Sequence, residues 1–298
     1  MQTQPLDPQK LNAMIALLED PDEGIYKHVE GKFLSYGHEV IPHLEAAWED
    51  CFDELLQNRI GNIISTIQFE SISKNIREWA KNGGENLLEG ILIISRYSNT
   101  SLDEEKVKKQ LNEITQDVWL EINDTLTALE KIKIVNHILF NLHCFIPNKD
   151  EYHSPDNSYL QHVLERKTGN PISLSIVYML VCEELGIPVY GIDLPMHFVL
   201  GYADDMSALV NYNDDGLPES VLFYINPFSN GAIFGRNEID TFLKDQQIEP
   251  EAKYYKPCGN IDIVKRVLRN LIHSYERKEN NKKVSELKQI LQELNLFL

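Results

Sequence analysis

The segment 169–186 constrains the fold of this chain more than any other part of its sequence. Ten of the fourteen positions in 172–185 are apolar, counting one tyrosine and one cysteine. A helix that is apolar on nearly every face must be buried on every side. Asn170 suits the N-cap of such a helix, and Pro171 suits its first turn. The sequence therefore predicts a buried central helix whose amino end lies near residue 171.

Charge and hydropathy narrow the class of protein. With 28 basic and 46 acidic residues among 298, the chain has a formal net charge of −18. Such a field repels phosphate backbones, which predicts that the protein binds no nucleic acid. The polar amino terminus lacks the apolar core of a signal peptide, and the longest apolar runs are too short to cross a bilayer. We therefore expect no association with a membrane.

The cysteines indicate the compartment. Cys51, Cys144, Cys182 and Cys258 are far apart in the sequence and form no Cys-x-x-Cys pair. This pattern argues against a zinc ribbon and against a disulfide framework, and it fits a reducing cytoplasm. The histidines have no spacing typical of a metal site. We expect a cytoplasmic protein with no metal and no cofactor.

The apolar pattern divides the chain into three regions and predicts an α+β fold that is mostly helical. Residues 1–146 carry apolar side chains at helical spacing, and residues 22–69 resemble a HEAT-type helical pair. A polar loop at 147–157 opens a central module, 147–256, which contains the sparse strands. Residues 257–298 predict two amphipathic helices around a charged turn and resemble a tetratricopeptide-type hairpin.

Individual elements follow from the periodicity of their residues. Helices are expected where apolar residues recur at helical spacing: 11–18, 25–36, 40–56, 60–69, 72–79, 87–97, 102–121, 126–145, 261–275 and 283–296. Strands are expected in runs rich in β-branched and aromatic residues: 188–192, 197–202, 208–212 and 221–225. The turn signal at 213–216 predicts that the last two strands form a hairpin.

A set of short motifs lies in the last half of the chain. The motifs surround the start and end of the central helix, the following histidine and a later Asn-Pro-Phe turn: Tyr152, Pro155, Asn157, Ser158, Leu160, Val163, Leu164, Arg166, Gly169, 171–174, 185–191, Pro195, His197, Phe198, 226–228 and Gly231. Together they resemble the signature of the SirB-type branch of the transglutaminase-like superfamily. The helix around Arg266 resembles the tetratricopeptide tail of the same branch. The resemblance implies a papain-like core with a small antiparallel sheet.

The resemblance also implies a thiol active site, and this chain lacks the thiol. Active members use a cysteine that forms a thioester, a histidine that moves protons and an aspartate that orients the imidazole. Carried over by position, His197 takes the place of the histidine, Asn226 that of the aspartate and Pro171 that of the cysteine. An asparagine can orient a histidine, but no thioester can form without the thiol. Met196 replaces the small residue expected before the histidine and is expected to narrow the cleft.

Three functions remain open on this sequence. We favour a pseudoenzyme, a non-catalytic transglutaminase-like protein that binds a protein or peptide through its cleft or its helical flanks. The alternative is a hydrolase, an amidase or peptidase, in which Ser173 acts as nucleophile with His197 and Asn226. The competing interpretation of Ser173 is a hydrogen bond within the helix start. A third possibility is a scaffold in which the central module only adds stability. Further cleft candidates are Asn157, Asn170 and Met196.

Overall fold

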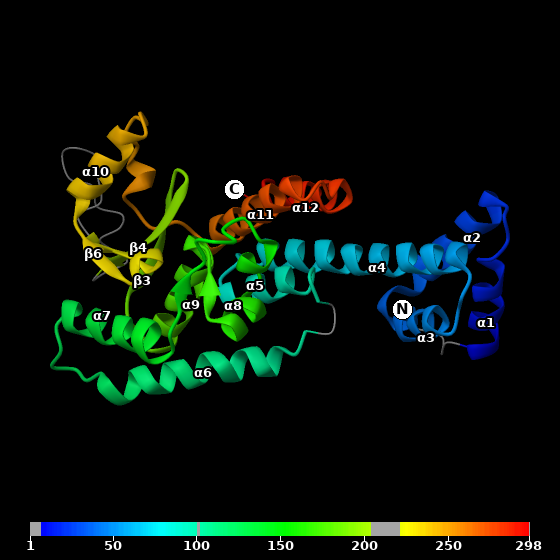
Figure 1. Ribbon diagram of the computed structural model, residues 1–298, viewed down its shortest axis with the longest axis horizontal. Coiled ribbons are helices and arrows are strands. Elements are labelled where there is room, and N and C mark those ends of the chain that lie inside the picture. Colours follow the sequence, from blue (N-terminus) through cyan, green and yellow to red (C-terminus); the bar gives the residue numbers. More distant parts are fainter. Residues whose placement is uncertain (1–6, 100–101, 204–220, 298) are drawn as a thin grey trace. The chain divides into compact units, whose positions relative to one another are not determined.

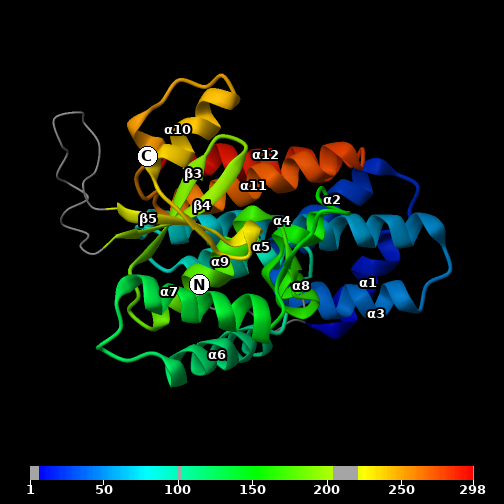
Figure 2. The ribbon, with the colours of Figure 1, turned by 60° about the vertical axis from the view of Figure 1, so that its left-hand side comes forward.

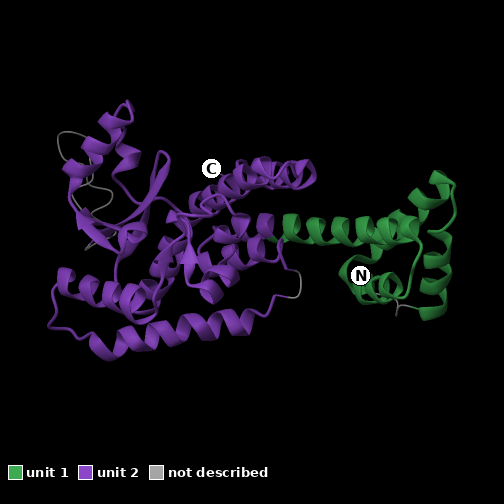
Figure 3. Cartoon of the chain, in the orientation of Figure 1, with its two compact units in different colours: residues 1–75 green, residues 76–298 purple. Residues whose placement is uncertain are grey.

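The computed structural model describes residues 7–99, 102–203 and 221–297. The chain forms two compact units, Met1–Asn75 and Ile76–Leu298 (Figure 3). The division falls within one long helix, α4 (Glu54–Lys81). The described residues are mostly helical, and the second unit contains a four-stranded antiparallel sheet (Figures 1 and 2). The predicted α+β class is confirmed.

Helices with apolar inner faces build the first unit. They are α1 (Pro8–Leu17), α2 (Glu23–Tyr36), the 3₁₀ turn η1 (Gly37–Val40), α3 (Ile41–Glu49) and the first part of α4. Leu18, Phe33 and Leu44 are fully buried in their shared core. Asp7 and Asp22 accept hydrogen bonds from first-turn amides of α1 and α2. The starts of these helices are therefore encoded locally.

The helices expected at 60–69 and 72–79 are in fact one helix. The glutamate and serine between them do not end a helix, and α4 runs through both ranges without a break. The helix expected at 40–56 is likewise wrong as a single element. Its first part ends with α3 at Glu49, and Leu56 belongs to α4.

Further helices of the described residues belong to the second unit. They are the end of α4, α5 (Leu87–Ser95), α6 (Glu104–Glu121), α7 (Ala128–Asn136), α8 (Leu160–Arg166), α9 (Pro171–Glu184), α10 (Arg236–Asp245), α11 (Asn260–Arg277) and α12 (Asn281–Leu294). α7 begins with a capping box of Thr127 and Glu130. It passes into a π-helical turn at His137–Leu142, so the range expected as one helix at 126–145 changes geometry partway.

The sheet has the strand order β3–β4–β5–β6. Its strands are β3 (Val189–Leu194), β4 (His197–Ala203), β5 (Val221–Asn226) and β6 (Ala232–Phe234). β3 and β4 form a hairpin in which Leu194 pairs with His197. The two-residue connection, Pro195 and Met196, therefore places His197 at the very start of its strand. A short parallel pair, β1 (Ile146–Pro147) with β2 (Thr168–Gly169), lies outside this sheet.

Three of the expected strands, 188–192, 197–202 and 221–225, lie within two residues of β3, β4 and β5. The strand expected at 208–212 and the turn at 213–216 lie outside the described residues. β6 and α10 were not predicted. β6 has only three residues, too few for a period of two to be recognised.

α9 is the predicted buried helix (Figure 1). Every residue from Pro171 to Cys182 is buried, and the two glutamates that end the helix are exposed. α9 packs on β3 and β4, and also on α6, α8 and α11. Because protein covers it on so many sides, a polar face would leave unpaired groups in the core.

α10 packs on the sheet through Ile239 and Leu243, which share an apolar cluster with Val199 of β4. Neighbours along a strand point to opposite faces, so Phe198 projects from the other face of β4. The strand that begins with His197 is therefore held between α10 and α9.

α11 and α12 form the expected helical hairpin (Figure 2). Tyr97 donates a hydrogen bond to Glu286 at 2.6 Å, and Arg77 pairs with Glu293 at 3.4 Å. These contacts join α12 to the end of α4 and to the turn that follows α5. The likeness of the hairpin to a tetratricopeptide repeat stays a prediction. Across the three described stretches of the chain, no helix has both the length and the apolar character needed to span a membrane.

Candidate functional site

A cavity of about 450 Å³ opens at the amino end of α9. We call it the α9 cleft. Its lining comes from the loop before α8, the start of α9, the β3–β4 connection and one face of α11: Tyr152, His153, Asn170, Pro171, Ile172, Met196, His197, Phe198, Arg266, Asn270, His273 and Ser274. Four of the seven residues expected at the site line it, namely Pro171, His197, Asn170 and Met196.

Asn170 and Ser173 form the start of α9. The Ser173 amide donates to Asn170 Oδ1 at 3.0 Å, and the Asn170 amide donates to Ser173 Oγ at 3.0 Å. This is a reciprocal capping box. The Ser173 hydroxyl also donates to the Asn170 carbonyl at 3.2 Å. Ser173 is buried and is not among the residues that line the cleft, so its hydroxyl is engaged in the cap.

Gly169 explains why the cap can be so tight. A Cβ atom at this position would lie 2.4 Å from Ser173 Oγ. Any other residue here would displace the serine hydroxyl. Asn170 is anchored in turn by its side-chain amide, which donates to Ser158 Oγ at 3.0 Å.

Pro171 lines the cleft at the position where the resemblance expects a cysteine. A proline has neither a nucleophilic side chain nor a backbone N–H to donate. None of the cysteines lines the cleft. Burial raises the pKa of the Cys182 thiol, and burial raises that of Cys258 to about 12. Both thiols therefore stay protonated and unreactive at neutral pH.

His197 lies partly buried in the wall of the cleft. Burial lowers the pKa of its imidazole, the positive charge of Arg266 lowers it further, and a side-chain hydrogen bond with Asn226 acts in the opposite direction. The ring is therefore neutral at pH 7. Among the hydrogen bonds of the described residues, none joins this ring to a serine or a cysteine. The part of the chain that the structure describes therefore contains no hydrogen-bonded pair of a hydroxyl or thiol with this imidazole.

Asn226 ends β5 and caps the short 3₁₀ turn η5 (Pro227–Ser229), in which its Oδ1 accepts the Phe228 amide at 3.1 Å. The same side chain influences the His197 ring. Asn226 is thus placed behind the histidine, outside the lining of the cleft.

Arg266 holds the β3–β4 connection in place. Its Nη1 donates to Asp193 Oδ1 at 2.8 Å and to the Leu194 carbonyl at 3.1 Å, and its Nη2 donates to the His197 carbonyl at 3.3 Å. Met196, between these residues, has a positive φ of 57° and is 66% exposed. Its side chain therefore forms part of the open rim, in a backbone conformation that favours glycine or asparagine.

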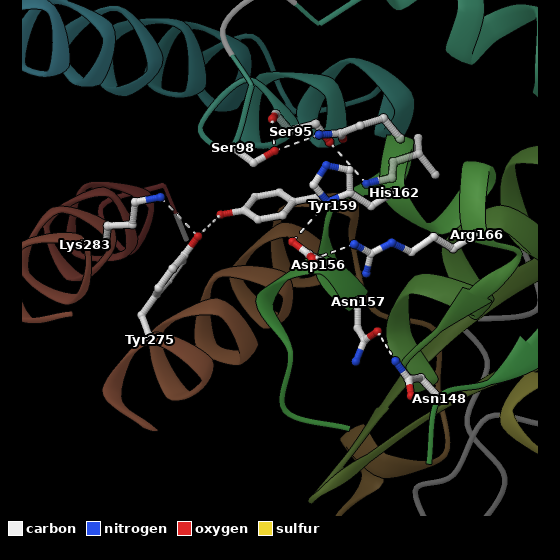
Figure 4. Close-up of polar contacts among 12 residues, drawn as sticks. Ser95, Ser98, Asn148, Asp156, Asn157, Tyr159, His162, Arg166, Tyr275 and Lys283 are labelled. Atoms are coloured by element: carbon white, nitrogen blue, oxygen red, sulfur yellow. Dashed lines mark hydrogen bonds and ion pairs between the residues drawn. The ribbon is translucent and has the colours of Figure 1, made fainter. Parts of the chain in front are cut away.

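Asn157 does not line the cleft; it shapes the loop that does (Figure 4). Its Oδ1 accepts Asn148 Nδ2 at 2.8 Å, and its Nδ2 donates to the carbonyls of Glu151 and Tyr152 at 2.7 and 3.1 Å. These bonds hold the backbone that presents Tyr152 and the following residue to the cleft.

The end of this loop is fixed to two other elements. It forms a 3₁₀ turn, η3 (Pro155–Ser158), in which Asp156 binds His162 and Arg166 of α8 at 3.2 and 2.9 Å. Figure 4 shows the hydroxyls of Tyr159 and Tyr275 directed at one another, 3.0 Å apart. The loop is therefore tied both to α8 and to α11.

The sequence did not point to every part of the cleft. His153, His273 and Ser274 were not expected there, and Arg266 and Asn270 belonged only to a motif of the carboxy-terminal helix. One signal was available: residues 266, 270 and 273 are spaced at four and three positions, which places them on one face of a helix. Nothing in the sequence indicated that this face meets the start of α9.

No group of three or more histidine, cysteine, aspartate or glutamate side chains among the described residues is arranged to hold a metal ion. The donors available in the cleft are imidazoles, amides, one guanidinium and two hydroxyls. These groups suit hydrogen bonding to a ligand.

Residues 105–269 match the family model described as Transglutaminase-like superfamily. The match covers more than half of the chain and includes α9 and nine of the twelve residues that line the cleft, whereas Asn270, His273 and Ser274 lie beyond it. The chain belongs to the transglutaminase-like superfamily. Assignment to its SirB-type branch stays a prediction.

Curated relatives of this chain include bacterial and mammalian proteins. A UPF0162 protein of Xylella fastidiosa (strain 9a5c) is 28% identical over 195 residues, which cover 63% of this chain and 64% of the relative. UPF0162 protein YchA of Escherichia coli (strain K12) is 22% identical over 189 residues, 62% of this chain and 65% of that protein. The match thus spans just under two thirds of these relatives.

F-box only protein 21 of Homo sapiens is 27% identical over 138 residues, which cover 39% of this chain and 22% of that protein. The shared part is therefore a module within a longer protein. No solved structure matches this chain.

Proposed function

We propose that this superfamily member is non-catalytic and binds a peptide segment of a protein partner in the α9 cleft. The observation that carries the proposal is that Pro171, the residue to which the resemblance assigns the nucleophile's place, lines the cleft. Nucleophilic catalysis needs a hydroxyl or thiol within hydrogen-bond reach of its base. The capping bonds of Ser173 and the absence of such a bond at His197 among the described residues support a binding role.

The dimensions and the chemistry of the cleft support the binding of a ligand. A cavity of about 450 Å³ lies within the roughly 300–1,000 Å³ typical of small-molecule and side-chain pockets. Apolar surface from Ile172 and Phe198 adjoins hydrogen-bonding groups of Asn270 and Ser274. A peptide side chain with a polar end matches this combination.

The relatives support a role in protein interaction in a limited way. Part of F-box only protein 21 is similar to this chain, so a related module occurs beside another domain within a longer chain.

A peptide-capture experiment tests the proposal. The full chain is incubated with a library of random hexapeptides, and retained peptides are identified by mass spectrometry. Asn270→Trp, which puts a large ring into the cleft, is expected to abolish retention. Lys278→Trp is the matched control, because Lys278 is exposed at the end of α11 and does not line the cleft. Circular dichroism checks that both variants fold.

Equal retention by both variants would exclude the cleft as the binding site. The hydrolase alternative is tested with the same protein on a panel of esters and amides. Turnover that disappears in His197→Ala and Ser173→Ala, with both variants folded, would overturn the non-catalytic proposal.

A further inference from the structure

We propose that the α9 cleft recognises an oxyanion, a carboxylate or phosphate carried by its peptide ligand, through a cationic wall built by α11. This inference rests on the proposed peptide-binding function and names the chemistry that the ligand must carry. The charge of the cleft lining is opposite in sign to the net charge of the molecule. The chain has a formal net charge of −18, yet the lining contains Arg266, three histidines and neither an aspartate nor a glutamate.

One face of α11 supplies most of this wall. Arg266, Asn270, His273 and Ser274 all line the cleft, and Arg277 continues the face one turn further. Arg277 Nε donates to His273 Nε2 at 3.3 Å. The positions 266, 270, 273 and 277 are four, three and four residues apart, which places them along one helical stripe.

The loop before α8 completes the wall. The rings of His153 and His273 meet edge to face, with their centroids 5.3 Å apart. Tyr152 packs against His153 at 5.0 Å in the same manner. A pair of imidazoles from different elements therefore faces the same cavity, next to Arg277.

The positive charge of Arg266 is only partly neutralised. Asp193 accepts its hydrogen bond at 2.8 Å and also lies 3.9 Å from Arg269. Two guanidinium groups thus share one carboxylate. Both terminal nitrogens of Arg266 already donate hydrogen bonds to the β3–β4 hairpin. Arg266 therefore contributes a positive electrostatic potential more than direct hydrogen bonds. The hydrogen-bond donors to the ligand are Asn270 and the imidazoles.

The start of α9 adds a further donor. Ile172 lines the cleft, and its amide makes no hydrogen bond among the described residues, as expected of the second residue of a helix. The adjacent amides of Asn170 and Ser173 are already used in the capping box. An oxyanion in the cleft would lie near the positive end of a helix of 14 residues, which favours an anion.

The charged neighbours predict a pH dependence. Burial lowers the pKa of His153, as do Arg277 and His273, and burial and Arg266 lower that of His197. Asn226 opposes the shift at His197, and Glu276 is the carboxylate that interacts with His273. A bound oxyanion offsets the cations and favours the protonated forms of His153 and His197. Binding therefore tightens as pH falls from 7.5 toward 6.

Nuclear magnetic resonance of the full chain with ¹³Cε1-labelled histidine tests this inference. The probes are glutarate, inorganic phosphate and the neutral analogue glutaramide. His153→Gln, His197→Gln and His273→Gln assign the three cleft signals. We expect glutarate or phosphate to shift these signals with one shared saturation curve, and glutaramide to leave them unchanged.

Two substitutions that each remove one positive charge separate the effect of the cationic wall from the effect of the overall charge of the protein. Arg277→Gln is expected to weaken anion binding by on the order of fivefold, the effect of losing one partly screened cation nearby. Lys278→Gln removes the same charge one residue further on, outside the cleft, and is expected to change the affinity by less than about twofold. Equal effects of the two substitutions would overturn the inference.

The peptide-capture experiment distinguishes this inference from the function on which it rests. Retained peptides are resynthesised in three forms: with a free terminal carboxylate, with a terminal amide, and with phosphoserine in place of any glutamate. Comparing their binding identifies the group that carries the oxyanion. Peptide binding sensitive to Asn270→Trp but indifferent to all these groups would overturn the inference and leave the proposed function intact. Anion binding in the cleft without any peptide binding would support recognition of an oxyanion and would overturn both the proposed function and the peptide as carrier of the oxyanion.

Discussion

At the scale of single residues, Pro171 lines the cleft and offers it neither a nucleophilic side chain nor a backbone N–H. The capping box of Asn170 and Ser173 and the fully buried helix behind it remain in place with a proline there. The amino end of a helix lowers the pKa of a thiol placed on it. The surroundings of a reactive cysteine are therefore present without the cysteine.

Pro171→Cys tests this view of the site. We expect the new thiol to have a pKa at least about one unit below the usual value near 8.5, because it lies at the positive end of α9. The measurement is the rate of iodoacetamide alkylation against pH, with peptide mass spectrometry to separate the cysteines. Lys278→Cys, on an exposed helix end, serves as the reference thiol. An inflection for Pro171→Cys at or above that of the reference would contradict the prediction.

Ser173→Ala is expected to change stability and leave any activity untouched. Loss of the capping hydroxyl should lower the free energy of unfolding by about 1 kcal/mol. Asn170→Ala removes the other half of the box, so the double variant should lose less than the sum of the single losses. Urea denaturation gives the three values. If the losses of unfolding free energy in the two single variants add up strictly in the double variant, the two side chains do not act cooperatively. That result would contradict the reciprocal capping box.

At the scale of elements, the cleft is formed where α9, α11 and the β3–β4 hairpin meet. Arg266 of α11 makes polar contacts with the hairpin, among them its ion pair with Asp193. Both groups are mostly withdrawn from water, with side-chain exposures of 17% and 27%. Removing one partner of such a pair leaves the other charge poorly solvated.

Arg266→Met is expected to lower the free energy of unfolding by about 2 kcal/mol at pH 7.5, less than for a completely buried pair. Burial raises the pKa of Asp193 above its unfolded value, and Arg266 and Arg269 oppose that shift. Without Arg266 the folded-state pKa rises further, so the folded state binds a proton more readily than the unfolded state. The loss is therefore largest above the folded-state pKa and shrinks as pH falls through it.

Denaturation of Arg266→Met at pH 5 and pH 7.5 measures this dependence. Asp193→Asn is the matched variant, because it removes the carboxylate charge that Arg266→Met leaves without its Arg266 partner. The double variant should be less destabilised than the sum of the two single variants. A loss that grows on acidification would contradict the assignment of the Arg266–Asp193 pair.

At the scale of the whole molecule, the chain consists of two compact units, each with its own apolar core. The family match, 105–269, lies entirely within the second unit, as does the cleft. The division expected on the sequence, with boundaries after 146 and 256, stays a prediction.

Phe33→Ala tests the independence of the first core. Phe33 is fully buried, so its truncation is expected to cost about 3–5 kcal/mol. Hydrogen exchange should accelerate within 7–75 and leave α9 protected. Leu243→Ala, in the apolar cluster of the sheet, should accelerate exchange in α9 and leave 7–75 protected. Loss of protection in α9 on truncation of Phe33 would show that the two cores unfold together.

The sequence by itself determined the elements whose signals are local. The apolar composition of 172–185 predicts burial, since no face of such a helix can meet water. Asn170 and Pro171 fix its start, and β-branched residues locate β3, β4 and β5. The absence of a thiol at the start of α9 was equally evident, given the resemblance. α10 was missed because its core contacts, Ile239 and Leu243, fill only one turn.

Only the tertiary structure decided which side chains share the cleft. His153, His197 and Arg266 come from segments that are more than 40 residues apart. Taken singly, each of the three is an ordinary polar residue of its own segment. No periodicity or fixed spacing in the sequence connects them. The packing of α11 beside β3 and α9 brings them together, and that packing depends on the shapes of complete apolar faces rather than on any short motif.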